Sequence, residues 1–155
     1  MAPASALCRC LTRRRALLGV AVVLAPAAAQ ALDLASLQFD QLYKSFGVRG
    51  YEFSDTLLGL KGKPVVMRGY MAPPLKPEID FFVLTSLPTA ICPFCDAAAS
   101  WPDDIVLVKL SRPVRALAYD ILLNVSGTLE IGEETDAGTG FVSLVRLRDA
   151  KYSKV

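Results

Sequence analysis

The sequence predicts a mainly β chain that forms a small five-stranded OB-like barrel with one or two short helices. Apolar runs of strand length follow one another between turn residues. Glycines stand inside two of these runs, where a small barrel needs sharp bends. Only short stretches carry helix signals. A generic β-sandwich fits the same pattern and is the alternative architecture.

The first predicted elements are a short helix and a strand. Residues 34–45 hold no single period and are assigned to neither class. Ser54 followed by Asp55 is typical of a helix start, and nearby glycines end that helix. Residues 64–71 then alternate as a strand, with Val65 and Met67 on one face and Arg68 on the other. Gly69 inside this strand predicts a bulge or a sharp curl.

Four further strands and one hairpin loop complete the predicted elements. Residues 80–85 are apolar on both faces, which indicates deep burial. A third strand covers 104–110 and stops before Pro113. A fourth covers 121–131, and a last alternating strand covers 141–148. Residues 132–140 between them predict a hairpin loop whose acidic side chains, Glu133, Glu134 and Asp136, form a solvated tip.

The N-terminus predicts a cleavable signal peptide over residues 1–31. A basic stretch ending at Arg15 precedes about ten apolar residues, too few to cross a membrane, and a small-x-small site ends at Ala31. We therefore expect a periplasmic protein without a stable membrane span after cleavage, exported by the general secretory or the twin-arginine route. The mature chain would begin at Leu32, with an N-terminal extension over 32–53 and the OB-like β domain over 54–155.

Removal of the leader changes the charge of the chain. Four of the 17 basic residues lie in the leader, which leaves 13 basic against 15 acidic residues and a net charge of −2. Proteins that bind nucleic acids neutralise phosphates with an excess of Lys and Arg. The mature composition therefore argues against nucleic acid as a partner.

The absence of histidine narrows the chemistry that this chain could perform. It excludes a Ser-His-Asp triad, a Cys-His pair and a histidine zinc motif. Cys8 and Cys10 would leave with the leader, so Cys92 and Cys95 remain as the only mature thiols. The sequence assigns no catalytic residue beyond this pair.

Three interpretations of the Cys92-Pro93-Phe94-Cys95 motif remain open. Cys92 could cap a short helix over 93–100, whose N-terminus would stabilise a thiolate for redox chemistry, as in the glutaredoxin motif that this one resembles. The pair could instead bind zinc or copper, with Asp96 and Asp103 as oxygen ligands. In a homodimer two pairs would supply four thiolates. A small disulfide or a pair of buried thiols that pins the loop is the third interpretation.

A resemblance is carried by residues 60–74, by 81–84 and by the cysteine loop that follows. Residues 62–73 fit the pattern G-K-x-V-x-x-x-G-Y-x-x-P, which resembles a family of exported bacterial proteins of unknown function. Many relatives carry Cys-x-His where this chain has Cys92 and Cys95. The resemblance implies an OB-like barrel and, for some members, an association with ABC-type permeases of the macrolide-exporter kind.

These observations together predict a periplasmic accessory or binding protein that is not an enzyme. It would be linked to an envelope transporter and would bind a thiophilic metal through Cys92 and Cys95. The alternative is a periplasmic thiol–disulfide oxidoreductase that uses the same two cysteines.

Overall fold

The structure is a computed structural model that describes residues 34–47, 50–74, 76–90, 104–137 and 139–155. These residues belong to the unit Leu32–Val155, one of the two units into which the chain divides. Within this described part, no helix is both long enough and apolar enough to cross a membrane.

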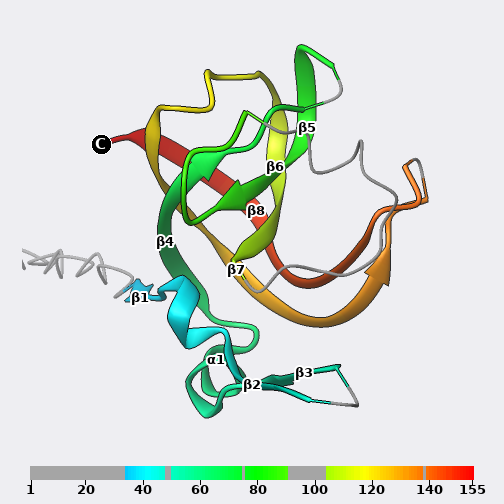
Figure 1. The fold of residues 1–155 in the computed structure, drawn as a ribbon. Helices are drawn as coiled ribbons and strands as arrows, with labels where there is room; N and C mark the ends of the chain where they lie inside the picture. Colours follow the sequence, from blue (N-terminus) through cyan, green and yellow to red (C-terminus); the bar gives the residue numbers. More distant parts are fainter. Residues whose placement is uncertain (1–33, 48–49, 75, 91–103, 138) are drawn as a thin grey trace, which may run out of the picture. The chain divides into compact units, whose positions relative to one another are not determined.

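Strands dominate the described residues, as the sequence predicts (Figure 1). The two short helices of this part are the 3-10 helix η1 and the α-helix α1. In chain order the elements are β1 (Ala35–Ser36), η1 (Phe39–Gln41), β2 (Tyr43–Gly47), β3 (Gly50–Phe53), α1 (Asp55–Leu60), β4 (Pro64–Met71), β5 (Glu78–Thr85), β6 (Ile105–Arg115), β7 (Leu122–Thr135) and β8 (Val142–Lys154).

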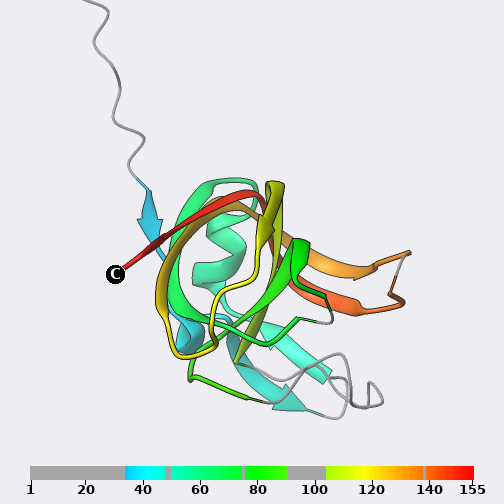
Figure 2. The ribbon, with the colours of Figure 1, turned by 90° about the horizontal axis from the view of Figure 1, so that it is seen from above.

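The strands form a six-stranded sheet and a separate hairpin. The sheet has the order β1-β4-β5-β6-β8-β7, and β2 pairs with β3 in the hairpin. β4 also pairs with β7, from Pro64 opposite Thr128 to Tyr70 opposite Leu122, so the pairings of five strands run in a ring. β1–β4 and β6–β8 are parallel and the other pairs are antiparallel. Figure 2 shows the long strands arching around a shared interior.

One face of these strands supplies most of the main core, and α1 and the residues next to η1 supply the rest. Its buried members are Leu37, Leu42, Leu57, Val65, Met67, Met71, Ile79, Phe82, Leu84, Val106, Val108, Leu123, Val125, Leu129, Ile131, Val145, Leu147 and Ala150. A second, smaller cluster contains Ala72, Val83, Ile105 and Leu107. Because successive side chains of a strand point to opposite faces, β5 contributes to both clusters, as its two-sided apolar sequence predicts.

The predicted helix start at Ser54 is confirmed. The Ser54 hydroxyl accepts a hydrogen bond from the main-chain N–H of Leu57 at 2.9 Å. It also donates to the carbonyl of Gln41. This side chain satisfies an N–H group that the first turn of a helix leaves without a partner, and it ties α1 to the end of η1.

The strand 64–71 has the predicted bounds, but all four later strands are longer than predicted, and β5 begins at Glu78 rather than at residue 80. β6 does not stop before Pro113 and continues to Arg115. Beyond Leu110, β6 no longer pairs with β8, and a proline is tolerated on such an unpaired edge because it needs no acceptor. The strand predicted to end at 148 continues as β8 to Lys154.

The strand predicted to end at residue 131 continues as β7 to Thr135. Its register with β8 shifts between Ile131 and Glu134, where Gly132 has a φ of 128°. A glycine adopts this backbone conformation readily, so the chain bends and then resumes pairing. The register of β4 with β7, by contrast, runs without a break through Gly69.

Candidate functional site

The residues predicted to carry the function lie outside the described part of the chain. These are Cys92, Cys95, Asp96 and Asp103, together with the predicted helix over 93–100. The structure does describe both ends of the connection that contains them. β5 ends at Thr85 and β6 begins at Ile105, and these two residues pair directly. The cysteine motif therefore belongs to a connection between two strands, as the sequence predicts, and the structure shows that these strands are antiparallel neighbours.

Hydrogen bonds join the two ends of this connection. The Ser86 main-chain N–H donates to the carbonyl of Asp104 at 3.2 Å, and the Ser86 hydroxyl donates to the Asp104 carboxylate at 3.1 Å. The Thr85 hydroxyl is 2.8 Å from the carbonyl of Leu87 and 3.3 Å from that of Tyr70. The positions where the chain leaves β5 and enters β6 are thus held by side chains as well as by the sheet.

Apolar residues of β5 and β6 lie next to the two ends of this connection. Ile105 and Leu107 of β6 and Val83 of β5 are buried in the smaller core cluster. Leu87, one residue beyond Ser86, is 70% exposed.

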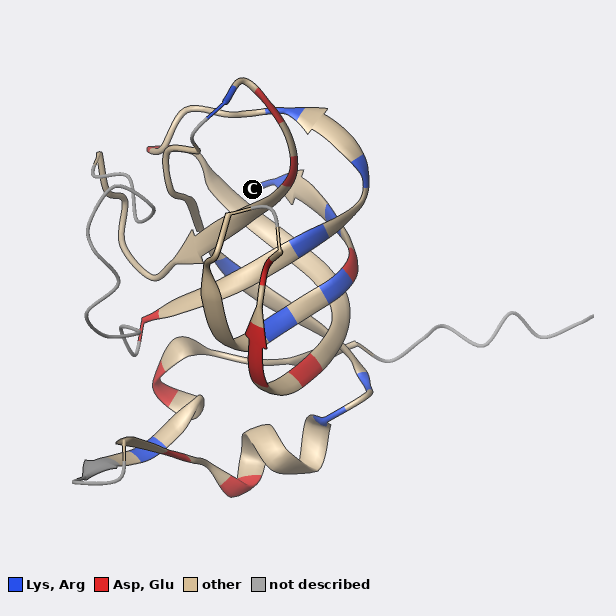
Figure 3. Cartoon of the chain, turned by 90° about the vertical axis from the view of Figure 1, so that its right-hand side faces the viewer, with Lys and Arg blue, Asp and Glu red and all other residues tan. Residues whose placement is uncertain are grey.

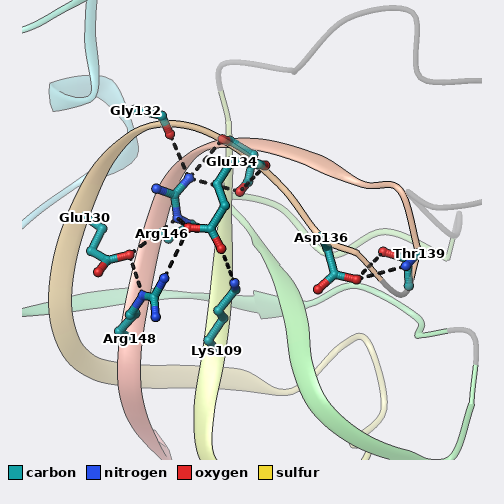
Figure 4. A network of polar contacts seen from close by, with 9 residues as sticks. Lys109, Glu130, Gly132, Glu134, Asp136, Thr139, Arg146 and Arg148 are labelled. Atoms are coloured by element: carbon teal, nitrogen blue, oxygen red, sulfur yellow. Dashed lines mark hydrogen bonds and ion pairs between the residues drawn. The ribbon is translucent and has the colours of Figure 1, made fainter.

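Two of the acidic residues assigned to a hairpin tip, Glu133 and Glu134, lie in β7 instead, and Glu133 is exposed there. Glu134 is part of β7, and its side chain is 30% exposed. Its carboxylate binds the ammonium of Lys109 on β6, and it lies 3.1 Å from Arg146 and 3.2 Å from Arg148 on β8 (Figure 4). The expectation of a solvated tip is wrong for Glu134, because β7 continues through the predicted loop.

Arg146 is the most buried member of this network, with 5% of its surface exposed. Its Nη1 donates to the carbonyl of Gly132 at 2.7 Å and to the carbonyl and hydroxyl of Ser143 at 2.9 and 3.1 Å. Its Nε lies 3.1 Å from Glu134 and 3.5 Å from Glu130, which is ion-pair distance, but makes no aligned hydrogen bond. Arg146 therefore joins the bend of β7 to β8.

The network shifts the titration of its members. The hydrogen bond from Lys109 is the main cause that lowers the pKa of Glu134. Burial opposes it as the second-largest effect, and the charges of Arg146, Lys109 and Arg148 lower the pKa further. The hydrogen bond and charge of Glu130, 2.5 Å from the Arg148 Nε, raise the pKa of Arg148. Every charged group of this network has an opposite charge beside it, which is typical of a structural network.

The described residues contain no group of three or more Cys, Asp or Glu side chains that could hold a metal ion. Acidic and basic segments are interleaved along the strands rather than gathered into one cluster (Figure 3). Asp136, from the predicted tip, accepts hydrogen bonds from the N–H and hydroxyl of Thr139 at 2.9 and 2.8 Å and so closes the β7–β8 turn.

Sequence reasoning did not identify the Arg146 network. The alternation of residues 141–148 places Arg146 and Arg148 on one face, which is a local signal. Their partners depend on register, because Glu130 stands directly opposite Arg146 in the β7–β8 pairing. The register of two strands joined through a bulge could not be read from the sequence.

No protein family and no curated protein matches this chain. Among solved structures, the chain is similar to the crystal structure of a DUF3299 family protein from Pseudomonas aeruginosa PAO1. The two share 16% sequence identity with a TM-score of 0.52, and the match covers 79% of this chain and 96% of that one. At this identity the similarity shows a shared fold.

Proposed function

We propose that this chain is a periplasmic binding protein without catalytic activity, which holds a thiophilic metal ion through Cys92 and Cys95. The observation that carries the proposal is the position of the two thiols. They are the only cysteines outside the predicted leader, and they share one connection whose ends Ser86 and Asp104 join by hydrogen bonds. Fixed ends reduce the conformational freedom that such a connection loses when it binds a ligand.

The donor set favours a soft metal. Thiolates select Zn²⁺ or Cu(I) over hard cations such as Mg²⁺. Two thiolates fill half of a tetrahedral zinc site, and Asp96 and Asp103 are the nearest oxygen donors in the sequence. A homodimer that pools two cysteine pairs would complete a four-thiolate site instead. Metal stoichiometry per chain distinguishes these arrangements, because the dimeric site holds one ion for two chains.

The scaffold for this site is, in our proposal, an OB-like barrel of five strands. The ring of pairings through β4, β5, β6, β8 and β7 supports it, as does the parallel pairing of β6 with β8. β1 would then be an added strand outside the barrel. We further propose a link to an envelope ABC-type transporter, which rests on the resemblance carried by residues 62–73.

A thiol–disulfide oxidoreductase is the competing function, and the spacing of Cys92 and Cys95 is the observation that favours it. A helix N-terminus at Cys92 would lower the pKa of its thiol and activate it for exchange. Such an enzyme would have a reduction potential close to that of the dithiol proteins of its compartment. A structural disulfide would instead resist reduction and bind no metal.

The deciding experiment measures zinc, copper and free thiols in protein purified under reducing, metal-replete conditions. We expect stoichiometric metal in the wild type and none in the Cys92→Ser, Cys95→Ser double variant. The Asp136→Asn variant is the control, because that carboxylate closes the β7–β8 turn and is not one of the proposed metal ligands. This variant should keep its metal. Disulfide reductase activity without bound metal would establish the competing function. A stable disulfide with neither metal nor activity would exclude both.

A further inference from the structure

A groove of about 710 Å³ lies on the outer face of β4 and β7. Val66, Arg68 and Tyr70 of β4 and Asn124 of β7 line it, and η1 contributes Asp40. Its size falls within the range of sites that bind small molecules. Val66 and Tyr70 are partly buried and supply apolar surface, while Arg68 and Asp40 are exposed. The groove therefore combines an apolar floor with two opposite charges.

The edge of β4 is unpaired where it borders this groove. The carbonyl of Val66 accepts a hydrogen bond from the N–H of Leu37 at 2.9 Å, and the carbonyl of Tyr70 accepts one from the Thr85 hydroxyl. Arg68 follows the same alternation and turns its main-chain groups to the same side. β1 pairs with β4 only at Val66 and the residue before it, and β5 only at Tyr70 and the residue after it.

The gap between the β1 and β5 pairings along this edge of β4 could hold an extended peptide. Within the described part of the structure, neither β1 nor β5 pairs with Arg68, so its N–H and C=O, which point away from β7, have no strand partner. An unpaired strand edge takes up extended peptides through main-chain hydrogen bonds. The three residues of β4 between its two neighbours span about 10 Å at a strand's rise per residue. That length suits a peptide of two or three residues rather than a long strand.

The side chain of Arg68 adds a charge at the same position. Its Nε donates to the side-chain oxygen of Asn124 at 3.3 Å, and its Nη1 and Nη2 groups form no hydrogen bond with the described residues. None of the described carboxylates forms an ion pair with it, whereas Arg146 and Arg148 each have two. A guanidinium with free N–H groups binds a carboxylate through two parallel hydrogen bonds.

Asp40 limits which anions this groove can accept. It lies in the first turn of η1 and forms no ion pair with any described residue. A carboxylate in the groove repels ligands with several negative charges and attracts an ammonium group. The two charges together match a ligand that carries one carboxylate and one ammonium, separated by apolar atoms and amides.

We propose that this groove binds a short free peptide in an extended conformation. The peptide carboxylate pairs with the guanidinium of Arg68, and an amide of the peptide pairs with the main chain of Arg68. The peptide ammonium lies toward Asp40. This proposal does not involve Cys92 or Cys95, so a test of peptide binding can fail while metal binding is confirmed, and the reverse.

Titration calorimetry of the purified protein tests the proposal with trialanine as the probe. We expect saturable binding of trialanine, and binding at least about tenfold weaker for trialanine amide, which lacks the carboxylate. Acetyl-trialanine, which lacks the ammonium, should also bind more weakly than trialanine. Equal binding of trialanine and its amide, or no saturable binding at millimolar concentration, would overturn the proposal.

Two variants assign the contacts. In Arg68→Gln, trialanine and its amide should bind equally weakly. In Asp40→Asn, the acetylated and free peptides should bind alike. Arg112→Gln is the matched control, because Arg112 is an exposed arginine on β6 outside this groove, and it should leave all affinities unchanged. Unchanged discrimination in Arg68→Gln would contradict the assignment. Thermal unfolding of each variant confirms that it is folded.

Discussion

Arg146 on β8 donates a hydrogen bond from Nη1 to the carbonyl oxygen of Gly132 on β7, at 2.7 Å. Gly132 lies in the register shift between Ile131 and Glu134, where β7 bends. A bulge leaves main-chain groups without ladder partners, and Arg146 satisfies one of them. The same guanidinium lies between the carboxylates of Glu130 and Glu134, so the bend and the charge network form one unit.

Replacement of Arg146 by methionine should destabilise the protein by about 2–3 kcal/mol, because hydrogen bonds to a buried charged group are strong and their carbonyl partners would lose them. Urea unfolding measures this loss. Arg148→Met is the control, since its side chain is 45% exposed. Its loss should stay below about 1 kcal/mol, as for other exposed ion pairs. Equal losses in the two variants would show that Arg146 does not hold the bend.

Glu134 should make the stability of the protein depend on pH in the acid range. Its cationic neighbours lower its pKa in the folded state below the ordinary value of 4.5. The stability that it contributes is therefore fully present above about pH 4.5. It is lost as the pH falls through the lower pKa of the folded state.

Urea unfolding at several pH values between 7 and 3 checks this effect. Glu134→Gln should be less stable than the wild type near pH 7, and the difference should shrink as the pH falls. Glu133→Gln is a matched control, because Glu133 is exposed and forms no ion pair with the rest of the described chain. A difference between Glu134→Gln and the wild type that stays constant with pH would contradict the assignment.

The sequence predicted those parts of the fold that depend on local pattern. The bounds of β4 match because side chains of alternating polarity mark a strand whose two faces differ, and Val65 and Met67 are buried while Arg68 is exposed. The helix start at Ser54 is equally local, because a capping side chain acts within one turn.

Strand lengths and cross-strand contacts depended on partners that the sequence does not reveal. β6 continues through Pro113 because that proline lies beyond the last pairing with β8, at Leu110. The Arg146 network likewise depends on the register between β7 and β8. Cys92, Cys95, Asp96 and Asp103 lie outside the described residues, so the candidate metal site stays a prediction from the motif.

At Gly69 the sequence identified a special position but did not reveal why glycine is needed there. The sequence predicts a bulge or curl there, whereas β4 keeps its register with β7 through Gly69. The need for glycine at this position comes from β5, which leaves no space for a side chain. A Cβ atom at Gly69 would lie 2.6 Å from the carbonyl oxygen of Thr85 and 3.0 Å from the Leu84 side chain. Glycine thus permits a close approach of two strands at the point where their pairing begins.

Gly69→Ala should therefore destabilise the protein by about 1–3 kcal/mol, because β5 must move away from β4 to accommodate the methyl group. Gly59→Ala is a matched substitution with the opposite expectation. Gly59 is exposed in α1, a Cβ there would meet nothing within 4 Å, and alanine favours the helix by about 0.5–1 kcal/mol. Chemical unfolding of both variants measures the two effects. Because both change glycine to alanine, the shared loss of unfolded-state freedom cancels in the comparison, and a Gly69→Ala variant as stable as Gly59→Ala would rule out the close strand contact.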